Sequence, residues 1–247
     1  MRIALIGAMG RMGQEVIRIL PEYGNLTLAA AVEHKNHPKI STEVSCGVFL
    51  INDLHSALLK TDVILDFSLA ETLPSLIEAL KEQPKPTLIC STGHNESVLK
   101  DLQNLSKKIP IGLCSNTSLG IYCLQEISIL AKKILGSDFD VTIHDLHHNL
   151  KKDAPSGTAL SLASSIKKES ADDQVISITS QRAGDVIGEH TVSYFGSSER
   201  IEITHRASSR SLFARGALKL LNIISSCQPG LYNASQLYSK AVKEINS

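Results

Sequence analysis

The N-terminal segment is the feature that most constrains the fold. Arg2–Ile6 is a short apolar stretch typical of a buried strand, and Gly7-Ala8-Met9-Gly10-Arg11-Met12-Gly13 follows it directly. Apolar residues from Val16 to Leu20 then recur at helical spacing. In such a strand–turn–helix unit, glycines permit a tight turn and close approach to a pyrophosphate, which the helix N-terminus attracts. The segment predicts dinucleotide binding. It lacks the Gly-Lys-Ser/Thr ending of a nucleoside-triphosphate loop.

An acidic residue after the second predicted strand supports this interpretation. The strand over 26–32 ends at Glu33, twenty residues after Gly13, where a carboxylate can accept hydrogen bonds from the ribose hydroxyls of NAD. His34 and Lys35 follow, and cations there can hold the extra phosphate of NADP, which Glu33 would repel. His34 and Lys35 are equally compatible with an exposed loop. The pattern therefore leaves the choice between NADH and NADPH open.

Strands and helices alternate up to Ser118. Strands are predicted over 63–68, 87–90 and 109–114, and helices near 53–59 and over 71–80 and 96–105, after a poorly periodic stretch from residue 36. This alternation is typical of a parallel sheet, whose ligands bind beyond the carboxyl ends of the strands. Polar residues follow three of these ends: Ser68, then Ser91 and Thr92, then Asn116 and Thr117. We expect them to line a ligand site.

The pattern changes after Ser118. A long helix is predicted over 119–135, followed by strands over 138–143, 175–180, 190–195 and 200–205, mostly with tight turns between them. This favours a second domain of α+β type with a mixed or antiparallel sheet. A last helix over 209–225 carries an apolar stripe that includes Leu220 and Leu221, and we expect it to pack back on the nucleotide domain, with a polar tail after it.

The predicted fold class is therefore α/β, with a Rossmann-type parallel-sheet dinucleotide domain and a second α+β domain. The first domain is predicted to span residues 1–118 and to be rejoined by 210–247. The second is predicted to span 119–209 and to bind the substrate.

The overall composition excludes several classes of protein. The 25 basic and 25 acidic residues balance, which argues against a nucleic-acid or anionic-membrane partner. The five cysteines are odd in number and form no C-x-x-C pair, so we expect thiols in a reducing compartment rather than a disulfide framework. The N-terminal apolar run is too short for a signal peptide, and no segment approaches the length of a membrane span. A cytoplasmic protein is expected.

A polar segment, His144–Leu160, carries the strongest signal for chemistry. It contains the adjacent pairs His147-His148 and Lys151-Lys152, and a helix start at Ser156-Gly157-Thr158. We interpret it as strand, loop and helix N-terminus, an arrangement that attracts anions. The alternative is a solvated basic loop. Because clustered cations repel one another, their clustering favours a binding site, with carboxylates as the expected ligand groups.

Three other interpretations of these residues must be weighed. A zinc site from His144, His147 and His148 is disfavoured because neighbouring lysines oppose a dication and no cysteine or glutamate completes the ligand set; we predict no metal. A semialdehyde-type dehydrogenase needs a cysteine nucleophile, and Cys114 stands at a suitable strand end but has no obvious base. A non-catalytic NAD(H)-sensing regulator would need neither Lys151 nor His147.

Motifs along nearly the whole chain resemble those of one known family. They are the glycine-rich turn, His147-His148 with Lys151, Asp153-Ala154-Pro155-Ser156-Gly157-Thr158-Ala159, Gly188-Glu189-His190-Thr191 and Glu202-Ile203-Thr204-His205-Arg206-Ala207-Ser208-Ser209-Arg210. The chain resembles the 4-hydroxy-tetrahydrodipicolinate reductase (dihydrodipicolinate reductase) family of diaminopimelate and lysine biosynthesis. The resemblance implies reduction of a cyclic imine dicarboxylate to tetrahydrodipicolinate with NADH or NADPH. It also implies a homotetramer held together by the substrate domain.

The resemblance also implies roles for individual residues. The pyrophosphate would lie against Gly7, Ala8, Met9, Gly10, Arg11 and Met12, and the adenosine ribose against Glu33 and His34. The nicotinamide side would be approached by Cys90, Ser91, Thr92, Cys114, Ser115, Asn116 and Thr117. His147 would be a proton donor or acceptor and Lys151 the proton donor. The substrate carboxylates would be bound by His148, Gly157 and Thr158. The family usually has glycine where Cys90 stands and arginine where His34 stands.

Overall fold

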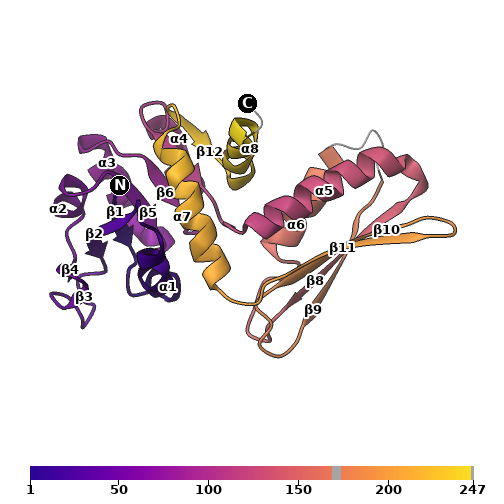
Figure 1. Ribbon diagram of the computed structural model, residues 1–247, viewed down its shortest axis with the longest axis horizontal. Helices are drawn as coiled ribbons and strands as arrows, with labels where there is room; N and C mark the ends of the chain where they lie inside the picture. Colours follow the sequence, from indigo (N-terminus) through magenta and orange to yellow (C-terminus); the bar gives the residue numbers. More distant parts are fainter. Residues whose placement is uncertain (169–173, 246–247) are drawn as a thin grey trace. The chain divides into compact units, whose positions relative to one another are not determined.

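The computed structural model describes residues 1–168 and 174–245, and the chain forms two compact units (Figure 1). Unit 1 consists of Met1–Ser118 together with the segment that begins at Ser211, and unit 2 consists of Leu119–Arg210.

Unit 1 is built on an eight-stranded sheet with the strand order β12-β7-β6-β5-β1-β2-β4-β3. The strands are β1 (Arg2–Ile6), β2 (Thr27–Val32), β3 (Glu43–Ser45), β4 (Val48–Ile51), β5 (Val63–Asp66), β6 (Thr87–Ile89), β7 (Pro110–Leu113) and β12 (Gly230–Tyr232). Every neighbouring pair is parallel except β3 with β4. The predicted parallel sheet is confirmed. This pairing brings the carboxyl ends of β1, β5, β6 and β7 to one edge.

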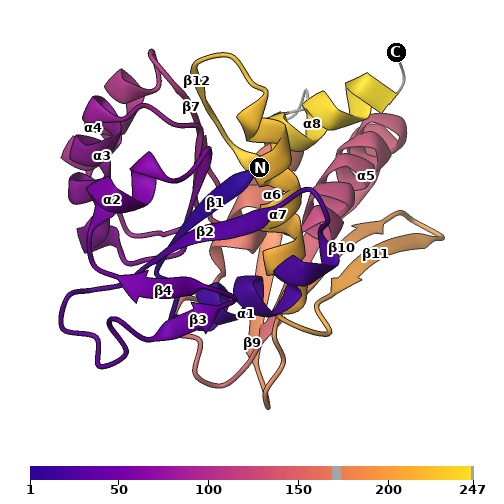
Figure 2. The ribbon, with the colours of Figure 1, turned by 60° about the vertical axis from the view of Figure 1, so that its left-hand side comes forward.

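Helices cover both faces of this sheet (Figure 2). They are α1 (Arg11–Ile19), α2 (Leu54–Leu59), α3 (Leu73–Glu82), α4 (Glu96–Leu105), α7 (Ser211–Ser225) and α8 (Ala234–Ile245), with short 3-10 helices at Leu20–Glu22 and Ala70–Thr72. All four residues of β5 are buried because side chains from helices meet them on both faces. The core of one face joins the sheet to α2, α3 and α4.

The last predicted helix packs where the sequence placed it. Helix α7 contacts α1, β5, β6 and β7, so the expected return to the nucleotide domain is confirmed. Its side chains Leu218, Leu220, Leu221 and Ile224 have no exposed surface. Burial of each such side chain contributes roughly 1.5–3 kcal/mol, so α7 is an integral part of unit 1.

Two stretches of unit 1 differ from the sequence-based expectation. The poorly periodic region after residue 36 contains β3 and β4, and the predicted polar tail forms β12 and α8. Strand β12 pairs with β7 through Leu231 and Ile111, and Leu237 and Tyr238 of α8 are buried. Apolar residues are sparse in the tail and show no clear helical or strand spacing. The structure of the tail therefore depends on tertiary contacts, which the local sequence does not reveal.

Unit 2 contains a four-stranded mixed sheet in the order β11-β10-β8-β9. Its elements are α5 (Leu119–Leu135), a 3-10 helix at Gly136–Asp138, β8 (Asp140–His147), α6 (Gly157–Lys168), β9 (Ser177–Arg182), β10 (Glu189–Phe195) and β11 (Arg200–Arg206). Strands β8 and β9 are parallel, and the other two pairs are antiparallel. Helices α5 and α6 cover one face, over a core that includes Ile143, Leu162, Val192 and Tyr194.

Strand β8 is longer than predicted. The sequence placed its end at Ile143 and the histidines in a loop, but pairing continues through Leu146 with Glu189 and through His147 with Arg182. Two neighbouring strands provide backbone partners there, so polar side chains do not end the strand. Alternating burial along β8 puts Asp145 and His147 on the helix-covered face.

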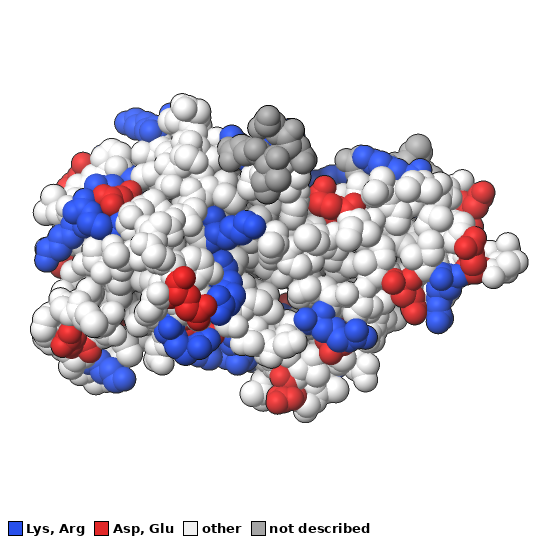
Figure 3. Space-filling model, viewed as in Figure 1, with Lys and Arg blue, Asp and Glu red and all other residues white. Residues whose placement is uncertain are grey.

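The surface and helices fit the charge and hydropathy of the sequence. Basic and acidic side chains are interspersed over the face shown in Figure 3, as expected for a chain with no net charge. Within residues 1–168 and 174–245, none of the helices combines the length and apolar character needed to cross a membrane.

Candidate active site

The glycine-rich turn of unit 1 has a compressed backbone. Gly7 has φ +74°, and a Cβ there would lie 2.8 Å from the backbone carbon and oxygen of Phe67. A Cβ on Gly13 would lie 2.2 Å from the oxygen of Gly7, so both positions need glycine. Gly10 precedes α1 and makes no side-chain cap, which leaves the helix start suited to an anion. The turn therefore meets the requirements of a dinucleotide pyrophosphate.

Glu33 lies beside this turn at the end of β2. Its carboxylate accepts hydrogen bonds from the backbone N–H groups of Met9 and His34, each at 3.0 Å. The side chain of His34 is exposed. A pocket of 570 Å³ adjoins Met9, and Arg18 and Lys39 also line it. Glu33 thus joins the turn to the end of β2, and the pocket adds cations that the sequence pattern did not single out.

The end of β5 carries a buried carboxylate that the sequence interpretation missed. Asp66 has no exposed surface and accepts hydrogen bonds from the backbone N–H and hydroxyl of Ser68 and from the hydroxyl of Ser91, the last at 2.7 Å. Burial raises the pKa of Asp66, although these hydrogen bonds oppose the shift. In the sequence, Asp66 follows the apolar residues Val63-Ile64-Leu65 directly, so the pattern indicates only the end of a buried strand. Its contacts tie the ends of β5 and β6 together.

The remaining predicted cofactor residues lie at the same edge but differ in exposure. Thr92 and Ser115 are exposed, whereas Thr117 is buried and its hydroxyl donates to the carbonyl of Phe213 at 2.7 Å. Cys90 is half-buried. Burial raises the pKa of the Cys114 thiol to about 12, so this cysteine stays protonated. A protonated, buried thiol is unsuited to the nucleophilic role that a semialdehyde dehydrogenase requires.

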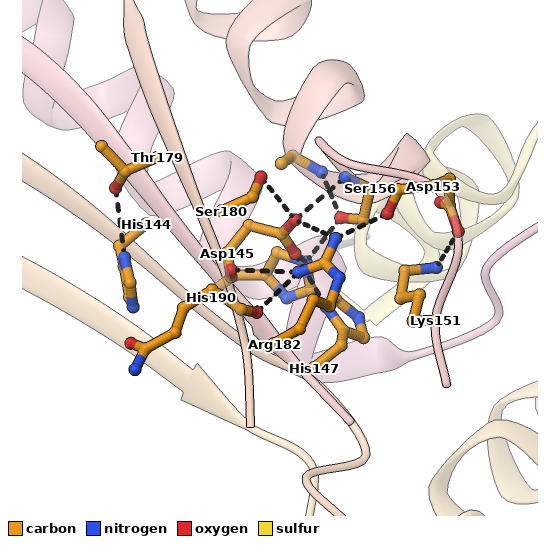
Figure 4. A network of polar contacts seen from close by, with 12 residues as sticks. His144, Asp145, His147, Lys151, Asp153, Ser156, Thr179, Ser180, Arg182 and His190 are labelled. Carbon is orange, nitrogen blue, oxygen red and sulfur yellow. Dashed lines mark hydrogen bonds and ion pairs between the residues drawn. The ribbon is translucent and has the colours of Figure 1, made fainter. Parts of the chain in front are cut away.

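Unit 2 contains a group of polar side chains around Asp145, shown in Figure 4. We call it the Asp145 cluster; it consists of Asp145, His147, Ser156, Ser180, Arg182 and His190. The carboxylate has no exposed surface. One of its oxygens, Oδ2, accepts from the N–H of Ser156 at 2.9 Å, from Arg182 Nη2 at 3.1 Å and from Ser180 Oγ at 3.2 Å.

The other oxygen, Oδ1, faces two imidazoles. His147 Nδ1 lies 2.8 Å from it and His190 Nε2 lies 3.4 Å from it. The two rings meet edge to face with centroids 5.2 Å apart. Strand pairing explains this convergence, because β10 lies next to β8 on one side and β9 on the other.

Burial and charge set the protonation states in the cluster. Burial alone would raise the pKa of Asp145, but hydrogen bonds from Ser156 and Arg182 and the nearby His147 lower it to about 2. Burial lowers the pKa of His147, although Asp145 opposes the shift. Burial also lowers the pKa of His190, to about 4. Near neutral pH the cluster therefore holds an ionised carboxylate and two neutral imidazoles.

The loop after β8 brings Lys151 near this cluster. Lys151 Nζ lies 2.8 Å from Asp153 Oδ1, and the lysine side chain is 23% exposed. Helix α6 begins at Gly157, and Ser156 Oγ accepts from the N–H of Ala159 at 3.2 Å, which caps the helix. Gly157 is exposed with open space around it. A cation thus stands on the loop that leads into an exposed helix start.

The structure does not assemble the histidine triad considered for zinc. His144 is on the opposite face of β8 from His147, and its Nδ1 lies 3.1 Å from Thr179 Oγ1. Asp145, His147 and His190 have possible ligand atoms within 4.8 Å of one another. However, the Arg182 guanidinium already pairs with the same carboxylate, and its charge opposes a dication there.

The sequence interpretation assigned no role to Asp145, Arg182 or His190, although His190 lies in the motif Gly188-Glu189-His190-Thr191. A local signal existed for Asp145, since it stands two positions before His147 and so shares its face of a strand. No local pattern in the sequence connects Arg182 and His190 to this site. They reach it because β9 and β10 pair with β8 in a register that places them beside Asp145 and His147.

Comparisons with known proteins agree over nearly the whole chain. Models of the dihydrodipicolinate reductase N-terminus and C-terminus match residues 1–117 and 120–237. The 4-hydroxy-tetrahydrodipicolinate reductase of Syntrophotalea carbinolica is 35% identical over 96% of this chain and 98% of its own. That of Trichlorobacter lovleyi is 36% identical over 94% and 96%. The dipicolinate-bound dihydrodipicolinate reductase from Paenisporosarcina sp. TG-14 has the same fold, with TM-score 0.80, 23% identity and coverage of 95% and 98%.

Proposed function

The chain belongs to the 4-hydroxy-tetrahydrodipicolinate reductase family, and from this premise we propose how its residues perform the reaction. The enzyme reduces 4-hydroxy-tetrahydrodipicolinate to tetrahydrodipicolinate with NADH or NADPH, in diaminopimelate and lysine biosynthesis. Water leaves in the overall reaction, and the ring gains a hydride and a proton. The observation that carries the assignment of roles is the placing of His147 and Lys151 between the end of β8 and the start of α6.

Unit 1 holds the cofactor in this proposal. Gly7 to Met12 contact the pyrophosphate, and Glu33 accepts from the adenosine ribose. The strand ends at Cys90–Thr92 and Cys114–Thr117 face the nicotinamide, which supplies the hydride when bound. Thr117 supports this strand end from within unit 1, because its hydroxyl donates to the carbonyl of Phe213 and its own carbonyl accepts from the hydroxyl of Tyr238.

Unit 2 supplies the proton and binds the substrate. Hydride addition to the conjugated double bond leaves electron density on the neighbouring carbon and nitrogen, and a positioned acid must then deliver a proton. Lys151 is that acid. His147 is neutral near pH 7 because burial lowers its pKa, so it takes part in proton exchange as a neutral imidazole.

The substrate carboxylates bind at the start of α6. His148, Gly157 and Thr158 contact them, and the helix dipole favours negative charge at this end. Nδ1 of His148 is buried and makes no hydrogen bond within the described part of the chain, which is consistent with a ligand partner. Gly157 supports the assignment because it leaves room for a carboxylate to approach the backbone.

We also propose that the enzyme is a cytoplasmic homotetramer that assembles through unit 2. The support is the family resemblance, together with a sheet whose other face no helix of the described residues covers, since α5 and α6 both pack on the same face.

An absorbance assay at the nicotinamide wavelength tests the function. The purified chain is given freshly generated substrate and either NADH or NADPH. We expect turnover with both, and NADH used at least as well as NADPH, because Glu33 opposes a 2′-phosphate. A tenfold or greater preference for NADPH, about 1.4 kcal/mol, would contradict the cofactor expectation. Binding of NADH without turnover would favour a non-catalytic sensor instead.

A further inference from the structure

Asp145 is the most buried charge near the proposed chemistry, but it cannot touch a substrate. Its carboxylate has no exposed surface, whereas the side chain of His147 is 11% exposed. A buried ionised carboxylate is retained only where partners compensate for lost hydration. Resting on the proposed function, we propose that Asp145 is a positioning residue that fixes the tautomer and orientation of His147 and, through Arg182, the loop that carries Lys151.

The tautomer follows from the hydrogen-bonding capacity of the two groups. An ionised carboxylate only accepts hydrogen bonds. Oδ1 of Asp145 and Nδ1 of His147 are both buried, lie 2.8 Å apart, and make no hydrogen bond elsewhere in the described residues. The proton of the neutral imidazole therefore sits on Nδ1. This leaves the lone pair on Nε2, so His147 enters the reaction as an acceptor while Lys151 remains the donor.

The orientation of the ring is restricted on a second side. A Cβ at Gly188 would lie 3.0 Å from His147 Nε2 and 3.3 Å from its Cδ2, so the absence of a side chain there makes room for the ring. His190 meets the ring edge to face. The ring is thus held between the carboxylate on Nδ1, the backbone at Gly188 and the ring of His190.

Arg182 connects the same carboxylate to the Lys151 loop. Its Nη2 donates to Asp145 Oδ2 at 3.1 Å and to the carbonyl of Asp153 at 2.6 Å. The side chain of Asp153 in turn pairs with Lys151. Asp145 therefore acts on both groups proposed for proton chemistry.

The amide variant Asp145→Asn tests the proposal with nearly unchanged size. Three donors converge on Oδ2, namely the N–H of Ser156, Ser180 and Arg182, so the amide oxygen of asparagine should take that place. Its NH₂ group then faces His147 Nδ1 and requires a lone pair there. The proton should move to Nε2, which inverts the tautomer, so kcat should fall by roughly 10²–10⁴.

The measurements are kcat, KM, NADH Kd and the ¹⁵N chemical shifts of His147, assigned by comparison with His147→Gln. We expect Nδ1–H in the unmodified enzyme and Nε2–H in Asp145→Asn, with NADH Kd unchanged and kcat reduced far more than KM rises. Asp138→Asn, an exposed aspartate of unit 2, should match the unmodified enzyme. A folded Asp145→Asn enzyme with nearly full kcat, or with Nδ1–H retained, would overturn the proposal.

A second variant covers the case in which Asp145→Asn does not fold. Gly188→Ala pushes on the His147 ring without changing the carboxylate, and it should lower kcat with little effect on NADH Kd. Full activity in this variant would contradict the orienting role. If His147→Gln itself keeps full kcat, the proposed function of His147 fails, while an inverted tautomer in Asp145→Asn would still establish the positioning contact.

Discussion

Lys151 and Lys152 are adjacent in the chain but have different surroundings. Lys151 is partly buried and pairs with Asp153, whereas Lys152 is exposed. Sequence chemistry alone could not choose between them, and the family motif selected Lys151. The structure adds a physical difference, because the Asp153 backbone is held by Arg182 and so the partner of Lys151 has a defined place.

Lys151→Ala should lower kcat by roughly 10²–10⁴, the usual contribution of a positioned acid. KM for the substrate should also rise, because a cation is removed near a dicarboxylate. NADH Kd should stay the same, since the glycine turn belongs to unit 1. Lys152→Ala is the matched control and should be nearly silent. Equal losses of kcat in both variants, with unchanged thermal melting, would reduce the two lysines to a general positive field.

His190 should make folding stability depend on pH. Its pKa falls from 6.5 to about 4, mainly because of burial; His147, His205 and Lys151 lower it by smaller amounts, and Asp145 opposes the shift. Between these two pH values the unfolded chain binds more protons, so stability falls as the pH falls from 6.5 towards 4, by about 3 kcal/mol at most. Asp145 adds a further loss of stability at lower pH, as the pH falls from 3.8, the ordinary pKa of an aspartate, towards its folded pKa of about 2.

The measurement is the urea midpoint of unfolding at a series of pH values between 7 and 4. His190→Gln should show a shallower decline than the unmodified chain. His144→Asn, on the other face of β8, should retain the full decline. An unchanged decline in His190→Gln would show that another group carries the pH dependence.

At the scale of helices and strands, the sequence predicted an element well where its apolar residues recur at regular helical or strand spacing. The 17 residues of α5 and the first strand with its glycine turn came directly from apolar spacing. The prediction ended strand β8 too early because the polar pair His144-Asp145 is typical of a loop. In the structure, both neighbouring strands pair with β8 at these two residues. Arg182 and His190 of the Asp145 cluster were missed because the register between distant strands has no local signature in the sequence.

Gly216 of α7 provides a test of how closely this helix packs in unit 1. A Cβ at this position would lie 1.8 Å from the carbonyl oxygen of Thr117, which also accepts from the hydroxyl of Tyr238 at 2.7 Å. Gly216→Ala must therefore move backbone, and we expect a loss of about 3 kcal/mol, at the upper end of the overpacking range.

Thermal or urea unfolding measures this loss. Gly24→Ala is the control, because Gly24 is exposed and a Cβ there would meet nothing within 4 Å. A Gly216→Ala chain as stable as Gly24→Ala would show that α7 can shift away from Thr117 at little cost.

At the scale of the whole molecule, the two units differ in how their sheets are covered. Helices cover both faces of the unit 1 sheet, whereas α5 and α6 cover one face of the unit 2 sheet. The open face carries Thr191 and Thr204, whose hydroxyls are 2.9 Å apart, and two ion pairs flank them, Arg206 with Glu189 and Arg200 with Glu202. If the chain is a tetramer, this uncovered face is the expected contact between copies, since sheets pack face to face.

Thr204→Lys tests that contact. Thr204 is exposed in the single chain, so a lysine there should leave the fold intact, but it would place buried charges between copies. Light scattering should give four times 26.7 kDa for the unmodified chain and a smaller mass for Thr204→Lys. Leu59→Glu changes an exposed leucine of unit 1 and should leave the mass unchanged.

Helix α5 also exposes Leu130 and Ile134, so a mass reduced by Leu130→Glu but not by Thr204→Lys would place the interface on α5. A monomeric unmodified chain would refute the tetramer itself.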